Sequence, residues 1–124
     1  MTTLDSLINQ DLDELQLKSI EAYEKIYADN RQCCKVCEER NKVDYKNWNP
    51  MSDYNHTWNI VDLLQSYGYT SMEFDAVTYE FYLENDEKFI GHGIGFPQAV
   101  CNCLVLFADS DYFARICKRK NDRS

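Results

Sequence analysis

Apolar side chains in the first third of the chain recur at steps of three and four residues. No glycine or proline interrupts residues 1–49, so the two strongest helix breakers are missing from that stretch. Steps of three and four place side chains on one face of a helix. The residues of this stripe are Leu4, Ile8, Leu12, Leu15, Ala22, Ile26, Cys33 and Val36. The pattern predicts a long helical region, either one helix that continues to about Val43 or two helices that separate near Asp29 and Asn30.

A second apolar stripe widens the face of this region. It consists of Leu17, Ile20, Tyr23 and Tyr27. An apolar face wider than one small domain can cover is typical of helices that also pack on another subunit. We therefore predict that residues 1–47 form a helical extension that assembles a homo-oligomer. The alternative is a helix that packs only on its own domain.

Another helix is predicted after Pro50, because proline disfavours helical backbone in the residue before it. Ser52 or Asp53 is the expected N-cap, since either side chain can accept a hydrogen bond from the first helical turn. Gly68 is expected to end the segment. The buried side of this helix is expected to hold Trp58, Val61, Leu63 and Leu64.

Alternation of apolar and polar residues then predicts three strands, over residues 71–76, 77–84 and 88–93. The middle strand shows the clearest alternation, in which Tyr79, Phe81 and Leu83 are interleaved with Glu80, Tyr82 and Glu84. Residues 85–87 form the expected turn. Pro97 suits the first turn of a further helix. A last helical segment is predicted over residues 112–120, after an interruption or new cap at residues 109–111.

The order of these elements predicts an α+β fold. It consists of a long N-terminal helical region followed by a small antiparallel sheet of about three strands flanked by helices, an αβα sandwich. Residues 48–112 are the predicted sandwich domain. Residues 113–124 are a basic C-terminal helix or tail.

Two segments of this domain are distinctive sequence motifs. They are WNPMSDYNHTWNIVDLLQSYGY, from residue 48, and Pro97-Gln98-Ala99-Val100-Cys101, at the start of a predicted helix. With the short strands between them, residues 48–107 resemble the phage ABA-sandwich domain. The resemblance implies a sandwich fold and a phage setting, and it carries no catalytic residues. The layout, a helical extension joined to such a domain, is also similar to that of the Thoeris anti-defence sponges, which sequester a nucleotide-like immune signal.

Charge is unevenly distributed along the chain, whose net value is −8. Residues 43–112 contain eleven acidic residues but only Lys46 and Lys88 as bases. Such a region repels nucleic acid and attracts basic surfaces, so no direct nucleic-acid partner is expected. The N-terminus has neither the basic nor the apolar segment of a signal peptide, and no apolar run is long enough to span a bilayer. We therefore expect a protein of the host cytoplasm, with no membrane partner and with its six cysteines reduced.

Cysteine spacing does not complete a metal site. Cys33, Cys34 and Cys37 contain one Cys-x-x-Cys, whereas zinc needs about four ligands, usually from two such pairs. The missing ligands would have to come from Cys101, Cys103, Cys117, His56 or His92. The simpler interpretation is that the first three are small apolar residues on a helix face. We predict no metal. No pattern places a nucleophile beside a base and an orienting third group, so we also predict no enzyme activity and no cofactor.

Four residues form the predicted ligand site: Tyr82, His92, Arg115 and Arg119. The two arginines are four positions apart on a helix, so both can reach one pyrophosphate. His92 lies in the glycine-rich stretch 91–95, which precedes a helix and resembles a phosphate-binding loop. Tyr82 would stack on a base. The alternatives are that the arginines complement the helix dipole and that the glycines serve backbone geometry.

Three functions remain open at this point. The first is a phage-encoded counter-defence protein that sequesters a small nucleotide signal at the four residues above. The second is an acidic inhibitor that occupies the nucleic-acid groove of a host defence protein, such as a CRISPR effector. Its contact surface would be the carboxylates Glu73, Asp75, Glu80, Glu84, Asp86 and Glu87. The third is a structural or regulatory phage protein.

Overall fold

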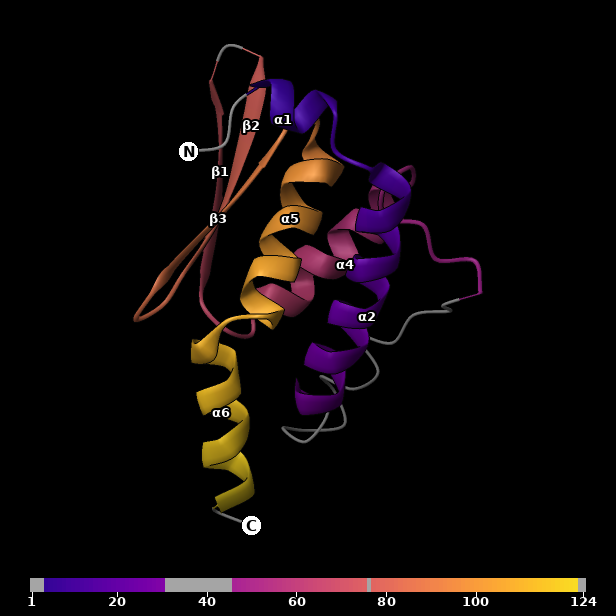
Figure 1. Ribbon diagram of the computed structural model, residues 1–124. Helices are drawn as coiled ribbons and strands as arrows, with labels where there is room; N and C mark the ends of the chain where they lie inside the picture. Colours follow the sequence, from indigo (N-terminus) through magenta and orange to yellow (C-terminus); the bar gives the residue numbers. More distant parts are fainter. Residues whose placement is uncertain (1–3, 31–45, 76, 123–124) are drawn as a thin grey trace.

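The computed structural model describes residues 4–30, 46–75 and 77–122. The described helices are α1 (Leu4–Ile8), α2 (Leu12–Asn30), α4 (Tyr54–Leu64), α5 (Phe96–Ala108) and α6 (Asp111–Asp122). The strands are β1 (Tyr69–Asp75), β2 (Thr78–Glu84) and β3 (Lys88–Gly93). The predicted α+β class, a three-stranded antiparallel sheet flanked by helices, is confirmed (Figure 1). None of the described helices has both the length and the apolarity needed to cross a bilayer.

The N-terminal helical region is divided earlier than the apolar spacing predicts. Helix α1 ends at Ile8, and α2 starts at Leu12. Asp11 caps α2, because its side chain accepts a hydrogen bond from the backbone N–H of Glu14 at 3.1 Å. Gln10 turns its side chain toward Asn102 of α5. The break therefore combines a local cap, which the sequence contains, with a contact across the fold, which periodicity does not reveal. The other predicted break, near Asp29 and Asn30, adjoins residues 31–45, which lie outside the described residues.

Helix α4 begins where its capping residue predicts. Asp53 has extended backbone, and its side chain accepts from the N–H of Asn55 at 2.9 Å. One expectation for its buried side is wrong: Trp58 is 52% exposed. Its indole packs beside the ring of Phe96, and the two ring centroids are 5.4 Å apart. The buried residues of the helix are Thr57, Ile60, Val61, Leu63 and Leu64.

The sheet has the order β1-β2-β3, with both pairs antiparallel. In β2 the predicted alternation is confirmed, because Phe81 and Leu83 are buried while Tyr82 between them is only half-buried. The turn from β2 to β3 is also where the sequence predicts it. There Asn85 accepts at its side chain from the N–H of Glu87, at 2.9 Å.

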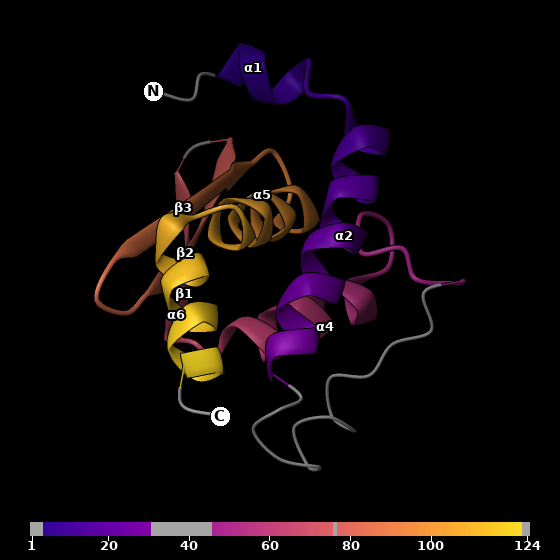
Figure 2. The same ribbon diagram turned by 60° about the horizontal axis from the view of Figure 1, so that its bottom comes forward.

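Helix α5 lies at the centre of the molecule, between the sheet and helices α2 and α4 (Figures 1 and 2). It packs directly on β3 because two glycines face it. A Cβ on Gly91 or Gly93 would meet backbone atoms of Ala99 at well under 3.0 Å. This close packing also shows which residues of β3 face α5. Because residues of a strand alternate between the two faces of a sheet, the remaining residues of β3 face away from α5.

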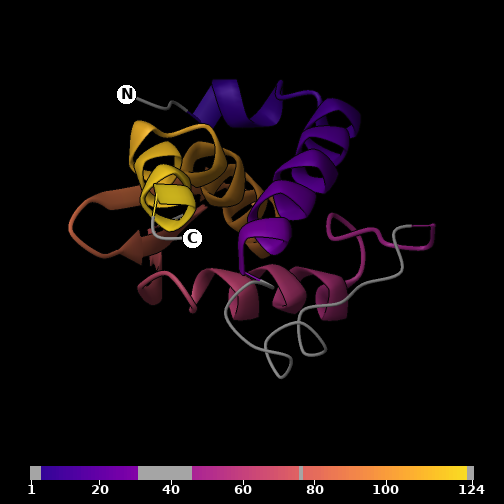
Figure 3. The same cartoon turned by 90° about the horizontal axis from the view of Figure 1, so that it is seen from below.

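One hydrophobic core joins the N-terminal helix, the sheet and the later helices. Helix α2 packs on α5 and α4, a layering that Figure 3 shows from below. The α2 side chains in this core are Leu15, Ala22, Tyr23 and Ile26. Helix α6 contributes Phe113, which is fully buried. Thus side chains from regions 1–47 and 113–124 contact the same core as residues 48–112.

Candidate functional site

The sheet face that points away from α5 carries four carboxylates. The pairing Phe81–Gly91 places odd-numbered residues of β2 and β3 toward α5. The pairing Glu73–Glu80 therefore places these two side chains on the opposite face. We call this opposite face the acidic face. Its carboxylates are Glu73 and Asp75 on β1 and Glu80 and Glu84 on β2.

Glu73 and Glu80 are direct cross-strand neighbours. Side chains opposite one another on antiparallel strands have Cβ atoms about 4.5–5.5 Å apart, and like charges in such a pair destabilise the sheet. Glu73 is exposed and Glu80 is half-buried. The pair therefore concentrates negative charge at an accessible point in the sheet.

The Tyr82 hydroxyl bridges this pair. It donates to Glu80 on its own strand and lies 3.4 Å from an oxygen of Glu73 on β1. The hydrogen bond to Glu80, followed by desolvation and the charges of Glu80 and Glu73, raises the pKa of Tyr82 well above its usual 10.0. The phenol thus stays protonated at neutral pH. Its single proton does not neutralise two carboxylates.

Positive charge is sparse around the acidic face. The sequence contains no lysine or arginine between Asn47 and Glu87. On the sheet, Lys88 at the start of β3 is the one lysine or arginine in the described residues, and its Nζ lies 4.8 Å from the centroid of the Tyr82 ring. A phosphate approaching Tyr82 would therefore meet two carboxylates and one lysine.

Arg115 of α6 is already paired. Its guanidinium donates to Glu87 in the β2–β3 turn at 2.9 Å, and it lies 5.8 Å from the centroid of the Tyr112 ring. Both partners in the ion pair are about half exposed, so its net stabilising effect is small, about 0–1 kcal/mol. The side chain of Arg119 lies outside the described residues. The predicted arginine clamp stays a prediction.

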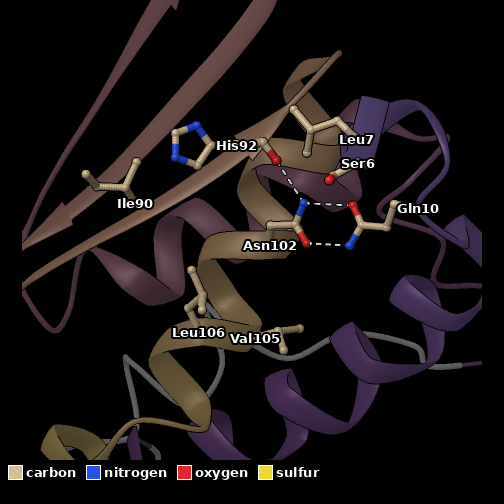
Figure 4. Close-up of a pocket in the computed structure, with 8 residues that line it drawn as sticks. All are labelled: Ser6, Leu7, Gln10, Ile90, His92, Asn102, Val105 and Leu106. Atoms are coloured by element: carbon tan, nitrogen blue, oxygen red, sulfur yellow. Dashed lines mark hydrogen bonds between the residues drawn. The ribbon is translucent and has the colours of Figure 1, made fainter. Parts of the chain in front are cut away.

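His92 is the cross-strand partner of Glu80, and it also lies beside a pocket at the edge of β3 (Figure 4). The pocket has a volume of about 350 Å³, within the range of small-molecule sites. Three elements form it: α1, β3 and α5. The lining residues are Ser6, Leu7, Gln10, Ile90, His92, Asn102, Val105 and Leu106.

Amide side chains fix the wall of this pocket. Gln10 and Asn102 exchange two hydrogen bonds, of 2.8 and 3.0 Å, and Asn102 also donates to the backbone carbonyl of His92. Gln98 donates to the side chain of Gln10 and to the carbonyl of Leu7. These bonds tie α1 to α5 and use amide groups that a ligand would otherwise contact. No lysine or arginine is among the lining residues.

The glycine-rich stretch is explained by packing. Gly91 and Gly93 allow α5 to approach β3, as described above. The N–H of Ile94, which precedes the helix, donates to the Gln98 side chain at 2.9 Å. That donor is therefore occupied within the fold.

Two of the three cysteines in the described region are core residues, and the third, Cys117, is half-buried. Cys101 and Cys103 are fully buried, and burial raises the pKa of each thiol from 9.0 to about 12. Such thiols are protonated and unreactive at neutral pH. Cys33, Cys34 and Cys37 lie outside the described residues. Within the described ranges, no three His, Cys, Asp or Glu side chains gather as metal ligands.

Exposed apolar side chains are the surface feature that the sequence reasoning missed. Met72 and Phe74 on β1 are 44% and 61% exposed. On α4, Tyr54 and Trp58 are also exposed, and both rings lie near Phe96. The alternation of Thr70, Met72 and Phe74 with Ser71 and Glu73 does indicate that Met72 and Phe74 lie on one face of the strand. What the pattern did not reveal is that α5 packs mainly on β3 and β2.

No known protein family, curated protein or solved structure matches the chain. The resemblance of residues 48–107 to the phage ABA-sandwich domain therefore stays a prediction.

Proposed function

We propose that this chain is a non-enzymatic binding protein that covers a basic surface of a protein partner with its acidic face. In the phage setting that the sequence suggests, the partner is a host defence protein whose basic groove otherwise holds nucleic-acid phosphates. The observation that carries the proposal is the cross-strand pair Glu73 and Glu80 on an accessible face.

Two physical arguments support this proposal. Opposed carboxylates work against sheet stability, and the single Tyr82 proton that bridges Glu73 and Glu80 does not neutralise both charges. A lysine- or arginine-rich partner would neutralise both charges on binding. The spacing of the carboxylates on the acidic face also supports the proposal. Alternate residues on one strand are about 6.6 Å apart, and neighbouring strands are about 4.8 Å apart. Carboxylates so placed present a closely spaced anionic surface, as a nucleic-acid backbone does.

Sequestration of a small nucleotide ranks second. Of its predicted residues, Tyr82 is bonded to carboxylates, Arg115 is paired with Glu87, and His92 lies at a pocket without lysine or arginine. Each of these surroundings disfavours a phosphate. Calorimetric titration with cyclic nucleotides and cyclic ADP-ribose isomers tests this function, and strong binding that the double change Arg115→Lys, Arg119→Lys abolishes would favour it.

Displacement of nucleic acid tests the proposed function. Purified host defence complexes are loaded with a fluorescent DNA duplex, and the chain is added at salt concentrations from about 50 to about 400 mM. We expect displacement that weakens steeply as salt rises. The double change Glu73→Gln, Glu80→Gln removes two charges while keeping side-chain size, and it should reduce displacement at least about tenfold.

A matched variant separates this effect from net charge. Asp13 and Glu24 are exposed on α2, away from the sheet, and Asp13→Asn with Glu24→Gln changes the net charge by the same amount. This variant should displace DNA like the unchanged chain. Equal losses in both double variants, or displacement that ignores salt, would contradict a role for the acidic face.

A further inference from the structure

Strand β1 has a free edge. Among the residues that the structure describes, the sheet order places β2 on one side of β1 and no strand on the other, so alternate backbone N–H and C=O groups of β1 point outward. Helix α5 packs on β3 and β2 and leaves β1 uncovered. Six of the seven β1 residues are exposed, and Thr70 is half-buried. A seven-residue strand is thus accessible along its edge and on both faces.

This edge lacks most of the features that usually block strand addition. Natural edge strands are protected by proline, by charged side chains, especially lysine, by a bulge or by a covering element. The sequence of β1, YTSMEFD, contains neither proline nor lysine, and its charged residues, Glu73 and Asp75, repel an acidic strand but attract a basic one. Its seven residues pair with β2 in an unbroken register, so there is no bulge. The edge therefore remains competent to pair with another strand.

The two faces of β1 specify different neighbours. Met72 and Phe74 are apolar and lie on the α5 side, whereas Glu73 and Asp75 lie on the acidic face. A strand added beside β1 continues both faces with a period of two residues. Its side chains next to Met72 and Phe74 would bury apolar surface. Those next to Glu73 and Asp75 would be most stable if basic.

We propose that the free edge of β1 binds an extended segment of the partner protein by strand addition, and that this segment alternates basic and apolar residues. The inference rests on the proposed function, since the basic residues of the segment are what the acidic face would bind. Main-chain hydrogen bonds would supply affinity, and the alternation would supply specificity.

Charge decides between such a partner and a second copy of this chain. The register that pairs all seven residues of two antiparallel β1 strands is centred on Met72. That register brings Glu73 of both copies close together, each beside its own Glu80. Four carboxylates would then gather at the dimer centre, which disfavours self-pairing. A basic segment removes this repulsion.

Synthetic peptides test the proposal on the intact chain. The probe is a labelled peptide of about nine residues in which lysine and valine alternate, and its binding is followed by fluorescence anisotropy. The control peptide has the same composition with all lysines in one block. We expect the alternating peptide to bind at least about tenfold more tightly than the block peptide. Phe74→Ala should weaken binding of the alternating peptide several-fold, whereas Leu17→Ala, a matched exposed change on α2, should not.

N-methylation of the peptide identifies strand pairing directly. Two further versions of the alternating peptide carry N-methyl groups on the odd or on the even residues. Both keep every side chain and charge, but in each only one edge has lost its N–H donors. Strand addition predicts that one version binds normally and the other binds at least about tenfold more weakly. Equal binding of both versions would overturn the proposal.

The variant Glu73→Gln, Glu80→Gln keeps this inference and the proposed function distinguishable. If both methylated versions bind equally but this variant binds neither, strand addition fails and the acidic-face function stands. If one methylated version is blocked but the variant binds as tightly as the unchanged chain, the edge stands and the proposed function fails. A dimer of the chain that Phe74→Lys dissociates would overturn the proposal in favour of self-pairing.

Discussion

At Gly91 the absence of a side chain allows α5 to lie against β3. A Cβ there would meet the backbone of Ala99 and Cys103, neither of which can move without shifting the helix. We expect Gly91→Ala to lower the free energy of unfolding by at least about 2 kcal/mol, through overpacking. At Gly95 the nearest atom to an added Cβ is 3.8 Å away, so Gly95→Ala should cost less than about 1 kcal/mol. Urea unfolding measures both. Equal losses would show that the helix–strand contact is looser than described.

Buried thiols make stability depend on alkaline pH. Cys101 and Cys103 ionise near 9.0 in an unfolded chain, whereas burial raises the pKa of both to about 12 in the folded chain. Between these values the unfolded state releases protons that the folded state keeps. The contribution of each thiol to the free energy of unfolding is therefore complete below pH 9. Above that pH it falls by about 1.4 kcal/mol per pH unit for each thiol. Urea unfolding between about pH 8 and pH 10.5 should show this slope, and Cys101→Ala with Cys103→Ala should flatten it. Identical slopes in both proteins would contradict the assignment.

Among the elements, those defined by local chemistry were predictable from sequence. Strand β2 alternates because one face is buried, and α4 starts at Asp53 because the cap is a local hydrogen bond. The break before α2 was missed although Asp11 offered a similar local cap, because the unbroken apolar spacing favoured one continuous helix. The bond between Gln10 and Asn102, 92 positions apart, is a further contact at this break that the sequence does not reveal. The predicted burial of Trp58 was wrong because the helical period shows which face of a helix is apolar. It does not show how much of that face the neighbouring elements cover.

The candidate site was predictable only in part. Alternation along β2 puts Glu80 and Glu84 on one face, and the sequence analysis named both carboxylates. Their opposition to β1 depends on strand register, which places Glu73 beside Glu80 and which single-strand patterns do not specify. The exposure of Met72 was unpredictable for a similar reason, since it follows from where α5 crosses the sheet.

Helix α2 is predicted to be required for stability. Ile26 is fully buried against the shared core, whereas Leu17 on the same helix is 63% exposed. We expect Ile26→Ala to lower the free energy of unfolding by about 2–4 kcal/mol, the usual range for a buried aliphatic residue. At a concentration low enough to keep the protein as single chains, Leu17→Ala should change it by less than about 0.5 kcal/mol. Chemical denaturation with tryptophan fluorescence measures both. A neutral Ile26→Ala would show that α2 can detach from the domain.

For the whole molecule, the predicted homo-oligomer is still to be measured. Leu4, Ile8, Leu12 and Leu17 are exposed on α1 and α2, and burial in an interface would stabilise an assembly. We expect light scattering at high micromolar concentration to give a mass above that of one chain. Ile8→Glu with Leu17→Glu should return it to one chain, whereas Val77→Glu, at an exposed site outside these helices, should not. A single-chain mass for the unchanged protein would contradict this prediction.

The central place of α5 has a consequence for the order in which the chain can fold during synthesis. Helix α5 is the element on which α2, α4, β2 and β3 all pack, yet it begins only at residue 96 of 124. While a ribosome adds about 5–20 residues per second, the finished N-terminal segments wait a second or more for this partner. Their apolar faces are exposed to chaperones and proteases throughout that time. A chain that ends before residue 96 therefore lacks the element on which its core packs, and we expect cellular proteases to degrade it.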